Sequence, residues 1–112
     1  AIAADTSRSP VDILSGRAEG VWRRVVGAAE EVLPPWHSKK CVFHDNLAQV
    51  LVARGDIEGA RRAFKAQWEV SRRCSGEGTP PTLAAKRLWE HPPRTTKELE
   101  ATYAARGRGF GA

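Results

Sequence analysis

Two stretches with the apolar spacing of amphipathic helices meet at Gly55-Asp56, near the middle of the chain. The apolar positions that share a face are Phe43, Leu47, Val50 and Leu51 before this point, and Ile57, Ala60, Phe64 and Trp68 after it. Gly55 suits the left-handed conformation that commonly ends a helix, and the Asp56 side chain can cap the next helix. Because so short a turn makes neighbouring helices antiparallel, we expect a helical hairpin over residues 41–74.

Helix start and stop signals before the hairpin predict two more helices. Ser9 and Pro10 suit the cap and the first position of a short helix, which Gly16 should end. A longer helix is expected over residues 19–33, where the apolar residues keep helical spacing, and Pro34-Pro35 terminates it.

Similar signals follow the hairpin. The loop CSGEGTPPT leads into a short helix that Pro80-Pro81 opens and that stops before Pro92-Pro93. Thr95 and Glu98 form a capping box for a last helix, which reaches Arg106. No alternation of apolar and polar residues longer than about four positions indicates a strand. The sequence therefore predicts an all-α fold, with short helices that flank the hairpin.

The 112 residues have room for one domain. Small polar residues in AIAADTSRS predict an extended N-terminal arm over residues 1–9, and the glycines of GRGFGA predict a flexible tail over residues 107–112. Between them we expect a helical domain over residues 10–106, with the hairpin 41–74 at its centre.

The charge balance is basic, with a net charge of +5 and a pI near 9.8. It favours acidic partners, which include nucleic acid, anionic lipid and acidic protein surfaces. The basic residues interleave with Asp and Glu, so the chain has no polybasic tract. No apolar run approaches the ~20 residues of a membrane-spanning helix, and we expect no membrane span.

The sequence contains no methionine. Two histories fit this composition: a cytoplasmic protein trimmed of its initiator, or an organellar protein after removal of a presequence. A small basic chain is a common form for subunits of organellar assemblies. The prediction is therefore a plastid or mitochondrion, with the cytoplasm as the alternative.

The stretch NLAQVLVARGDIEGARRAF resembles a tetratricopeptide repeat (TPR). The matching residues are Leu47, Ala48, Gly55, Asp56, Ala60 and Phe64. The chain departs from the repeat at His44, Gln67 and Arg72. The resemblance implies a TPR-like antiparallel helical hairpin of about 34 residues, the length of one such repeat, that packs on other helices or on a partner.

A narrower likeness includes the flanking segments LPPWHSKK and CSGEGTPPT. With them, the hairpin is similar to the C-terminal helical region of SET-and-MYND-type lysine methyltransferases. In that family the region is a partner-binding module beside the catalytic domain. Nothing in this chain matches the catalytic or zinc-binding parts, so the resemblance implies a docking module without methyl transfer.

Cys41 and Cys74 lie at the open end of the predicted hairpin. Their distances from Gly55 along the two helices differ by roughly 7 Å at ~1.5 Å per residue, which disfavours a disulfide and favours two thiols. His37, Cys41 and His44, with Cys74 or His91 as a fourth ligand, match no standard zinc spacing. We expect no metal and no cofactor.

No nucleophile elbow, phosphate-binding loop, dinucleotide-binding motif or metalloprotease motif is present. We therefore expect no catalytic residues and no enzyme activity. The predicted role is a protein–protein interaction or scaffold subunit that docks into a larger assembly. The alternative is a nucleic-acid-binding subunit of an organellar ribonucleoprotein.

Large aromatic side chains in Pro- or Gly-rich flanks and basic positions on one helix are the candidate partner contacts. They are Trp36, Trp89 and Phe110, with Arg61, Lys65 and Arg72. Exposed aromatic and arginine side chains often anchor an interface. The same residues also allow a purely structural interpretation, in which the aromatics pack over the domain's own hairpin and the basic residues form a solvated outer face.

Overall fold

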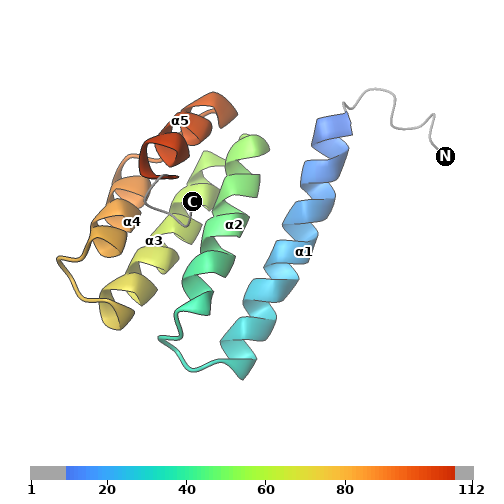
Figure 1. The fold of residues 1–112 in the computed structure, drawn as a ribbon. Coiled ribbons are helices and arrows are strands. Elements are labelled where there is room, and N and C mark those ends of the chain that lie inside the picture. Colours follow the sequence, from blue (N-terminus) through green and yellow to red (C-terminus); the bar gives the residue numbers. More distant parts are fainter. Residues whose placement is uncertain (1–9, 108–112) are drawn as a thin grey trace.

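The computed structural model describes the backbone of residues 10–107 and the side chains of residues 16–105. Within this range every regular element is a helix, so the prediction of an all-α fold is confirmed. The helices are α1 (Pro10–Val32), α2 (Lys39–Ala53), α3 (Ile57–Cys74), α4 (Pro80–Glu90) and α5 (Thr96–Gly107). The first four follow one another across the molecule (Figure 1). The predicted arm over residues 1–9 and the predicted tail after Gly107 lie outside the described residues.

The expectation of two separate helices before the hairpin is wrong, because α1 is one continuous helix of 23 residues. Gly16 lies inside it and does not end it. A glycine in a helix costs only about 1 kcal/mol relative to alanine, which the packing of the helix can offset. At Gly16 an added Cβ atom would come within 2.9 Å of the Arg54 guanidinium, and Arg54 in turn pairs with Glu19 of α1 at 2.7 Å.

The turn between α2 and α3 has the predicted chemistry. Gly55 adopts a positive φ of 83°, and the Asp56 carboxylate accepts a hydrogen bond of 2.9 Å from the Gly59 amide. The Cys41 thiol at the start of α2 lies 3.7 Å from the Gln67 carbonyl near the end of α3. The two helices therefore run antiparallel.

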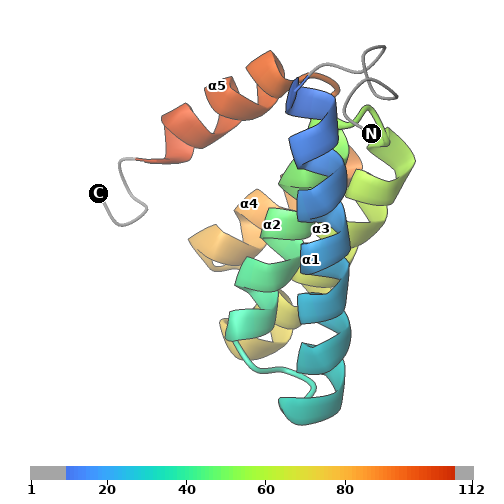
Figure 2. The same ribbon diagram turned by 90° about the vertical axis from the view of Figure 1, so that its right-hand side faces the viewer.

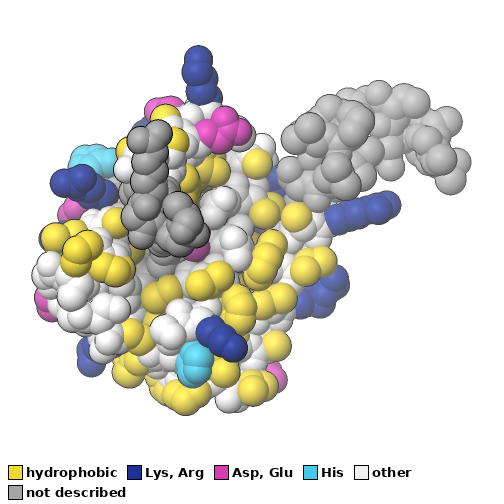
Figure 3. Space-filling view, viewed as in Figure 1, with side chains coloured by type: hydrophobic (Ala, Val, Ile, Leu, Met, Phe, Trp, Pro, Cys, Tyr) yellow, Lys and Arg dark blue, Asp and Glu magenta, His cyan; other side chains and the backbone are white. Residues whose placement is uncertain are grey.

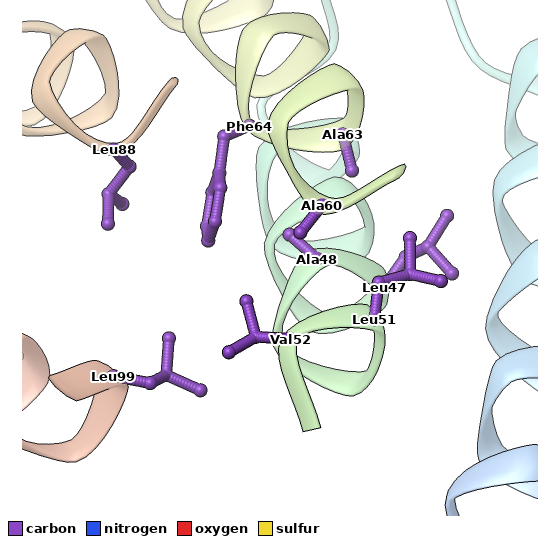
Figure 4. Close-up of a cluster of buried hydrophobic side chains, with 9 residues drawn as sticks. All are labelled: Leu47, Ala48, Leu51, Val52, Ala60, Ala63, Phe64, Leu88 and Leu99. Carbon is purple, nitrogen blue, oxygen red and sulfur yellow. The ribbon is translucent and has the colours of Figure 1, made fainter. Parts of the chain in front are cut away.

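The core is centred on the seam between α2 and α3 (Figure 4). Ala48 and Ala60 are both completely buried where the helices meet, because their small side chains allow a close approach. Phe64 is also completely buried and points toward the side from which Leu88 and Leu99 enter the cluster. The rest of the cluster consists of Leu47, Leu51, Val52 and Ala63.

The outer helices are attached by few contacts. Among the described helices, α1 makes close backbone contact with α2 alone, and α5 likewise makes close backbone contact only with α2. Figure 2 shows α5 directed away from the other four helices. It is held by Leu99 in the core cluster and by the Tyr103 hydroxyl, which donates to the Asp45 carboxylate. Within the described part of the chain, the packing leaves one side of α1 and of α5 without a neighbouring helix.

Candidate interaction surfaces

Basic and aromatic side chains gather along the outer side of α3. Arg61, Lys65, Trp68 and Arg72 recur at steps of four, three and four residues, which places them in one line along the helix. Trp89 from α4 lies against this line, and Trp36 from the loop before α2 lies against Arg73, the residue that follows Arg72. We call this surface the basic-aromatic face; it consists of Trp36, Arg61, Lys65, Trp68, Arg72, Arg73 and Trp89.

At one end of this face, two cations share the Trp89 ring. The Arg61 guanidinium lies 5.9 Å and the Lys65 ammonium 5.3 Å from the ring centroid, within the range of cation–π attraction. Arg61 also donates a hydrogen bond of 3.1 Å to the Trp89 carbonyl. The Trp68 ring packs on Trp89 with centroids 5.6 Å apart and planes tilted by 43°.

At the other end each ring carries one arginine. Arg72 lies 5.0 Å from the Trp68 centroid and pairs with Glu77 at 3.1 Å. Arg73 lies 4.9 Å from the centroid of Trp36, which keeps 45% of its surface exposed. The Cys74 thiol donates to the Trp36 carbonyl, which fixes the loop against the end of α3.

The structure brings together five of the six residues singled out as partner contacts: Trp36, Arg61, Lys65, Arg72 and Trp89. Phe110 lies outside the described residues. Trp36 and Trp89 do pack over the chain's own hairpin, as the structural interpretation of these residues requires. No pattern in the sequence indicated that Arg73 would contact the Trp36 ring. The helical spacing placed Trp68 in the buried stripe of the hairpin, whereas the structure places it on this face. The i, i+4 and i+3 spacing of Arg61, Lys65 and Trp68 was the signal that could have grouped them.

A second surface, on α1, was not predicted. Val21, Val25, Ala28 and Val32 recur at steps of four, three and four residues, and we call them the α1 apolar stripe. Val32 is 77% and Val21 46% exposed. Figure 3 shows hydrophobic side chains gathered along α1 and between α1 and α2 on this side of the molecule.

Shallow hollows border the splayed helix α5. One of about 540 Å³ lies between α4 and α5, and one of about 380 Å³ lies where α1, α2 and α5 meet. The first is lined by Ala84, Arg87, Leu88, Glu90, His91, Thr102 and Ala105. Both hollows are open and are lined by apolar and polar side chains.

The titratable side chains between α1 and α2 form a structural cluster. The almost completely buried Lys40 pairs with Glu30 at 3.3 Å, and the His44 ring lies 3.7 Å from the same carboxylate. Burial lowers the pKa of His44 from 6.5, although Glu30 opposes this effect. The Lys40–Glu30 pair therefore links α2 to α1, and the His44 ring lies beside the same carboxylate.

The two cysteines are free thiols. Burial raises the pKa of Cys41 to about 11, and the neighbouring Cys74 and Asp45 contribute to this rise. This thiol is therefore protonated at neutral pH and is not an activated nucleophile. Among the described residues no three His, Cys, Asp or Glu side chains are grouped as a metal site would require. No helix in the described range is both long and apolar enough to cross a bilayer.

Comparisons with protein-family models, with curated proteins and with solved structures found no match to this chain.

Proposed function

We propose that the chain is a non-enzymatic interaction subunit, which docks onto an acidic surface of a partner protein through its basic-aromatic face. The observation that carries this proposal is the placement of cations from α3 over indole rings from three separate segments. Arginine and tryptophan are the residue types most enriched among the side chains that dominate interface energies.

The geometry reduces the cost of binding. A long basic side chain loses about 0.5–1.5 kcal/mol of conformational freedom when an interface immobilises it. Lys65 and Arg61 already rest on the Trp89 ring, and Arg73 rests on Trp36. Part of that loss is therefore incurred in folding rather than in binding.

Several of these cations also keep their charge available. Among the described residues Arg61, Lys65 and Arg73 form no salt bridge, whereas Arg72 pairs with Glu77. Carboxylates of a partner can approach them without displacing an existing ion pair. The TPR resemblance of the hairpin implies the same kind of role, a helical docking module, and it is part of this proposal.

Nucleic-acid binding is the second candidate, because Arg61, Arg62, Lys65, Arg72 and Arg73 all project from one helix. Base stacking has little support here: Trp89 is covered by two cations and by Trp68, and Trp68 by Arg72. The cations alone could contact phosphates. Such binding loses affinity steeply with salt, by roughly one unit of logarithmic slope per phosphate neutralised.

Two labelled probes separate these candidates in fluorescence anisotropy, a polyglutamate peptide and a single-stranded RNA. The proposal predicts that the chain binds polyglutamate and that the charge reversals Arg61→Glu and Lys65→Glu together abolish this binding. The matched control, Arg94→Glu with Lys97→Glu, makes the same change in net charge at exposed positions outside the face. The control should bind almost as well as the parent chain.

Polyglutamate binding that both double variants lose equally would show a general charge effect and would contradict the proposed face. Tighter binding of RNA, with a steep salt slope that the Arg61 and Lys65 reversals reduce, would favour the nucleic-acid candidate. Absence of binding to either probe would refute both.

A further inference from the structure

We propose that the chain self-associates through α1, whose apolar stripe packs antiparallel against the same stripe of a second copy. This surface is separate from the basic-aromatic face and does not depend on the function proposed for that face. The kind of partner follows from the exposure, the spacing and the charge pattern of α1.

α1 carries two apolar stripes but packs on only one of the described helices. Trp22, Val26 and Ala29 face α2, where Trp22 packs on Phe43 with ring centroids 6.4 Å apart. Each of Val21, Val25 and Ala28 directly precedes one of these residues in the sequence. The α1 apolar stripe therefore lies about a quarter-turn away around the helix. α1 packs on no helix other than α2, so this second stripe has no covering helix among the described residues.

The stripe also carries apolar side chains that stay exposed in the folded chain. The large hydrophobic side chains that remain markedly exposed are Val21, Val32, Trp36, Val42 and Leu83. Of these, Trp36 is in contact with Arg73, whereas two of the others lie on the α1 apolar stripe. A contiguous apolar stripe on a folded chain is the usual mark of an interaction surface.

The charge pattern beside the stripe indicates a second copy as the partner. Arg24 and Glu31 are both exposed, and neither pairs with another described side chain. They are seven residues apart, which is about 10 Å along the helix and on nearly the same side. They cannot pair within one helix, but two antiparallel copies place each Arg24 beside the Glu31 of the other copy.

The same arrangement also fits the apolar residues. A two-fold axis near Ala28 lies between Arg24 and Glu31, and it brings Val21 and Val25 of one copy toward Val32 of the other. The small side chain of Ala28 allows the helices to approach closely at the axis. In a parallel two-fold pair, the flank with Arg24 and Glu31 would lie on opposite sides of the contact in the two copies, so these residues would not meet. The α1 surface is thus self-complementary in the antiparallel direction, as a two-fold dimer interface must be.

Sedimentation equilibrium on the full chain at low salt tests this proposal. The parent chain should show a concentration-dependent monomer–dimer equilibrium. Val32→Glu, at a position 77% exposed in the monomer, should weaken dimerisation at least about tenfold, because it sets a charge in the apolar contact of both copies. Leu83→Glu is the matched control: its position on α4 is 50% exposed, and it should leave the dimer unchanged.

Charge reversal tests the antiparallel direction. Arg24→Glu and Glu31→Arg should each weaken the dimer about tenfold, because each turns two attractive pairs into repulsive ones. The double variant restores both pairs with their signs exchanged and should recover the parent affinity. Circular dichroism spectra that match the parent chain would show that the helices of each variant remain folded.

A parent chain that stays monomeric at every concentration would overturn the proposal. A dimer that Leu83→Glu weakens as much as Val32→Glu would place the interface elsewhere. A double variant as weak as the single reversals would rule out the antiparallel arrangement.

Discussion

The basic-aromatic face and the α1 apolar stripe differ in whether their hydrophobic side chains are in contact with other side chains of the same chain. On the basic-aromatic face, the rings of Trp36, Trp68 and Trp89 are each in contact with at least one cation of α3. On α1, Val21 and Val32 remain exposed and have no such cover from the described residues. The large aromatics, which look like free anchors in the sequence, are largely occupied within the chain, whereas modest aliphatic side chains form the uncovered surface.

This difference follows from where each surface lies in the fold. α3 has α2 on one side and α4 on the other, and loops at its ends bring in further side chains. α1 stands at the edge of the row and contacts a single helix (Figure 1). A central helix can therefore be covered from within the chain, and an edge helix depends on another molecule.

The largest expected effect concerns Trp89. Trp89→Ala should lower the free energy of unfolding by about 2–3 kcal/mol, because the half-buried ring packs on Trp68 and carries two cations. Urea denaturation measures this loss. Trp36→Ala, at the exposed end of the same face, is the control and should cost less than about 1 kcal/mol. Equal losses would mean that the face is not packed more tightly at Trp89.

A smaller effect comes from His44, whose ring lies beside Glu30 of α1. Burial lowers the pKa of His44 in the folded chain, so the unfolded chain binds more protons as the pH falls below 6.5. The free energy of unfolding should therefore decrease as the pH falls through this region and level off above it. Urea midpoints measured across this pH range check the trend. His44→Gln should flatten that part of the profile, and an unchanged slope in this variant would assign the effect to other groups.

The cations of the basic-aromatic face should contribute less to folding than to binding. Lys65→Ala should lower the free energy of unfolding by about 0.5–1 kcal/mol, the usual value of an exposed cation–π contact. In the anisotropy assay the same variant should bind polyglutamate more weakly. If Lys65→Ala lowered the free energy of unfolding but bound polyglutamate as well as the parent chain, Lys65 would contribute to folding and not to binding.

The smallest effect on folding is expected on the α1 apolar stripe. Val32→Ser should change the free energy of unfolding of the monomer by less than about 0.5 kcal/mol, because the side chain is mostly exposed. Unfolding at high dilution isolates the monomer, and sedimentation of the same variant should still show a weaker dimer. A large loss of monomer stability would indicate that Val32 packs within the chain.

Local chemistry made much of the fold predictable. The pairing of α2 with α3 could be anticipated because Gly55 and Asp56 settle the turn by their own conformations, without help from distant residues. The length of α1 could not be anticipated, because Gly16 is a weak stop signal and the helix continues through it.

The candidate sites divide in the same way. The residue types and the helical spacing of Arg61, Lys65 and Arg72 pointed to one surface. Trp89 and Trp36 contact side chains of α3 only because α4 and the loop before α2 pack beside that helix. No local sequence pattern encodes this packing. The exposure of Val21 and Val32 depends equally on the position of α1 at the edge of the row.

Disulfide trapping tests most directly the claim that the chain self-associates through the α1 apolar stripe and not through the basic-aromatic face. In a background with Cys41→Ala and Cys74→Ala, Ala28→Cys places a thiol near the proposed two-fold axis, and Lys65→Cys places one on the basic-aromatic face. Under mild oxidation the account predicts a cross-linked dimer of the Ala28→Cys variant, while the Lys65→Cys variant stays monomeric on a non-reducing gel. Cross-linking of the Lys65→Cys variant without cross-linking of the Ala28→Cys variant would contradict it.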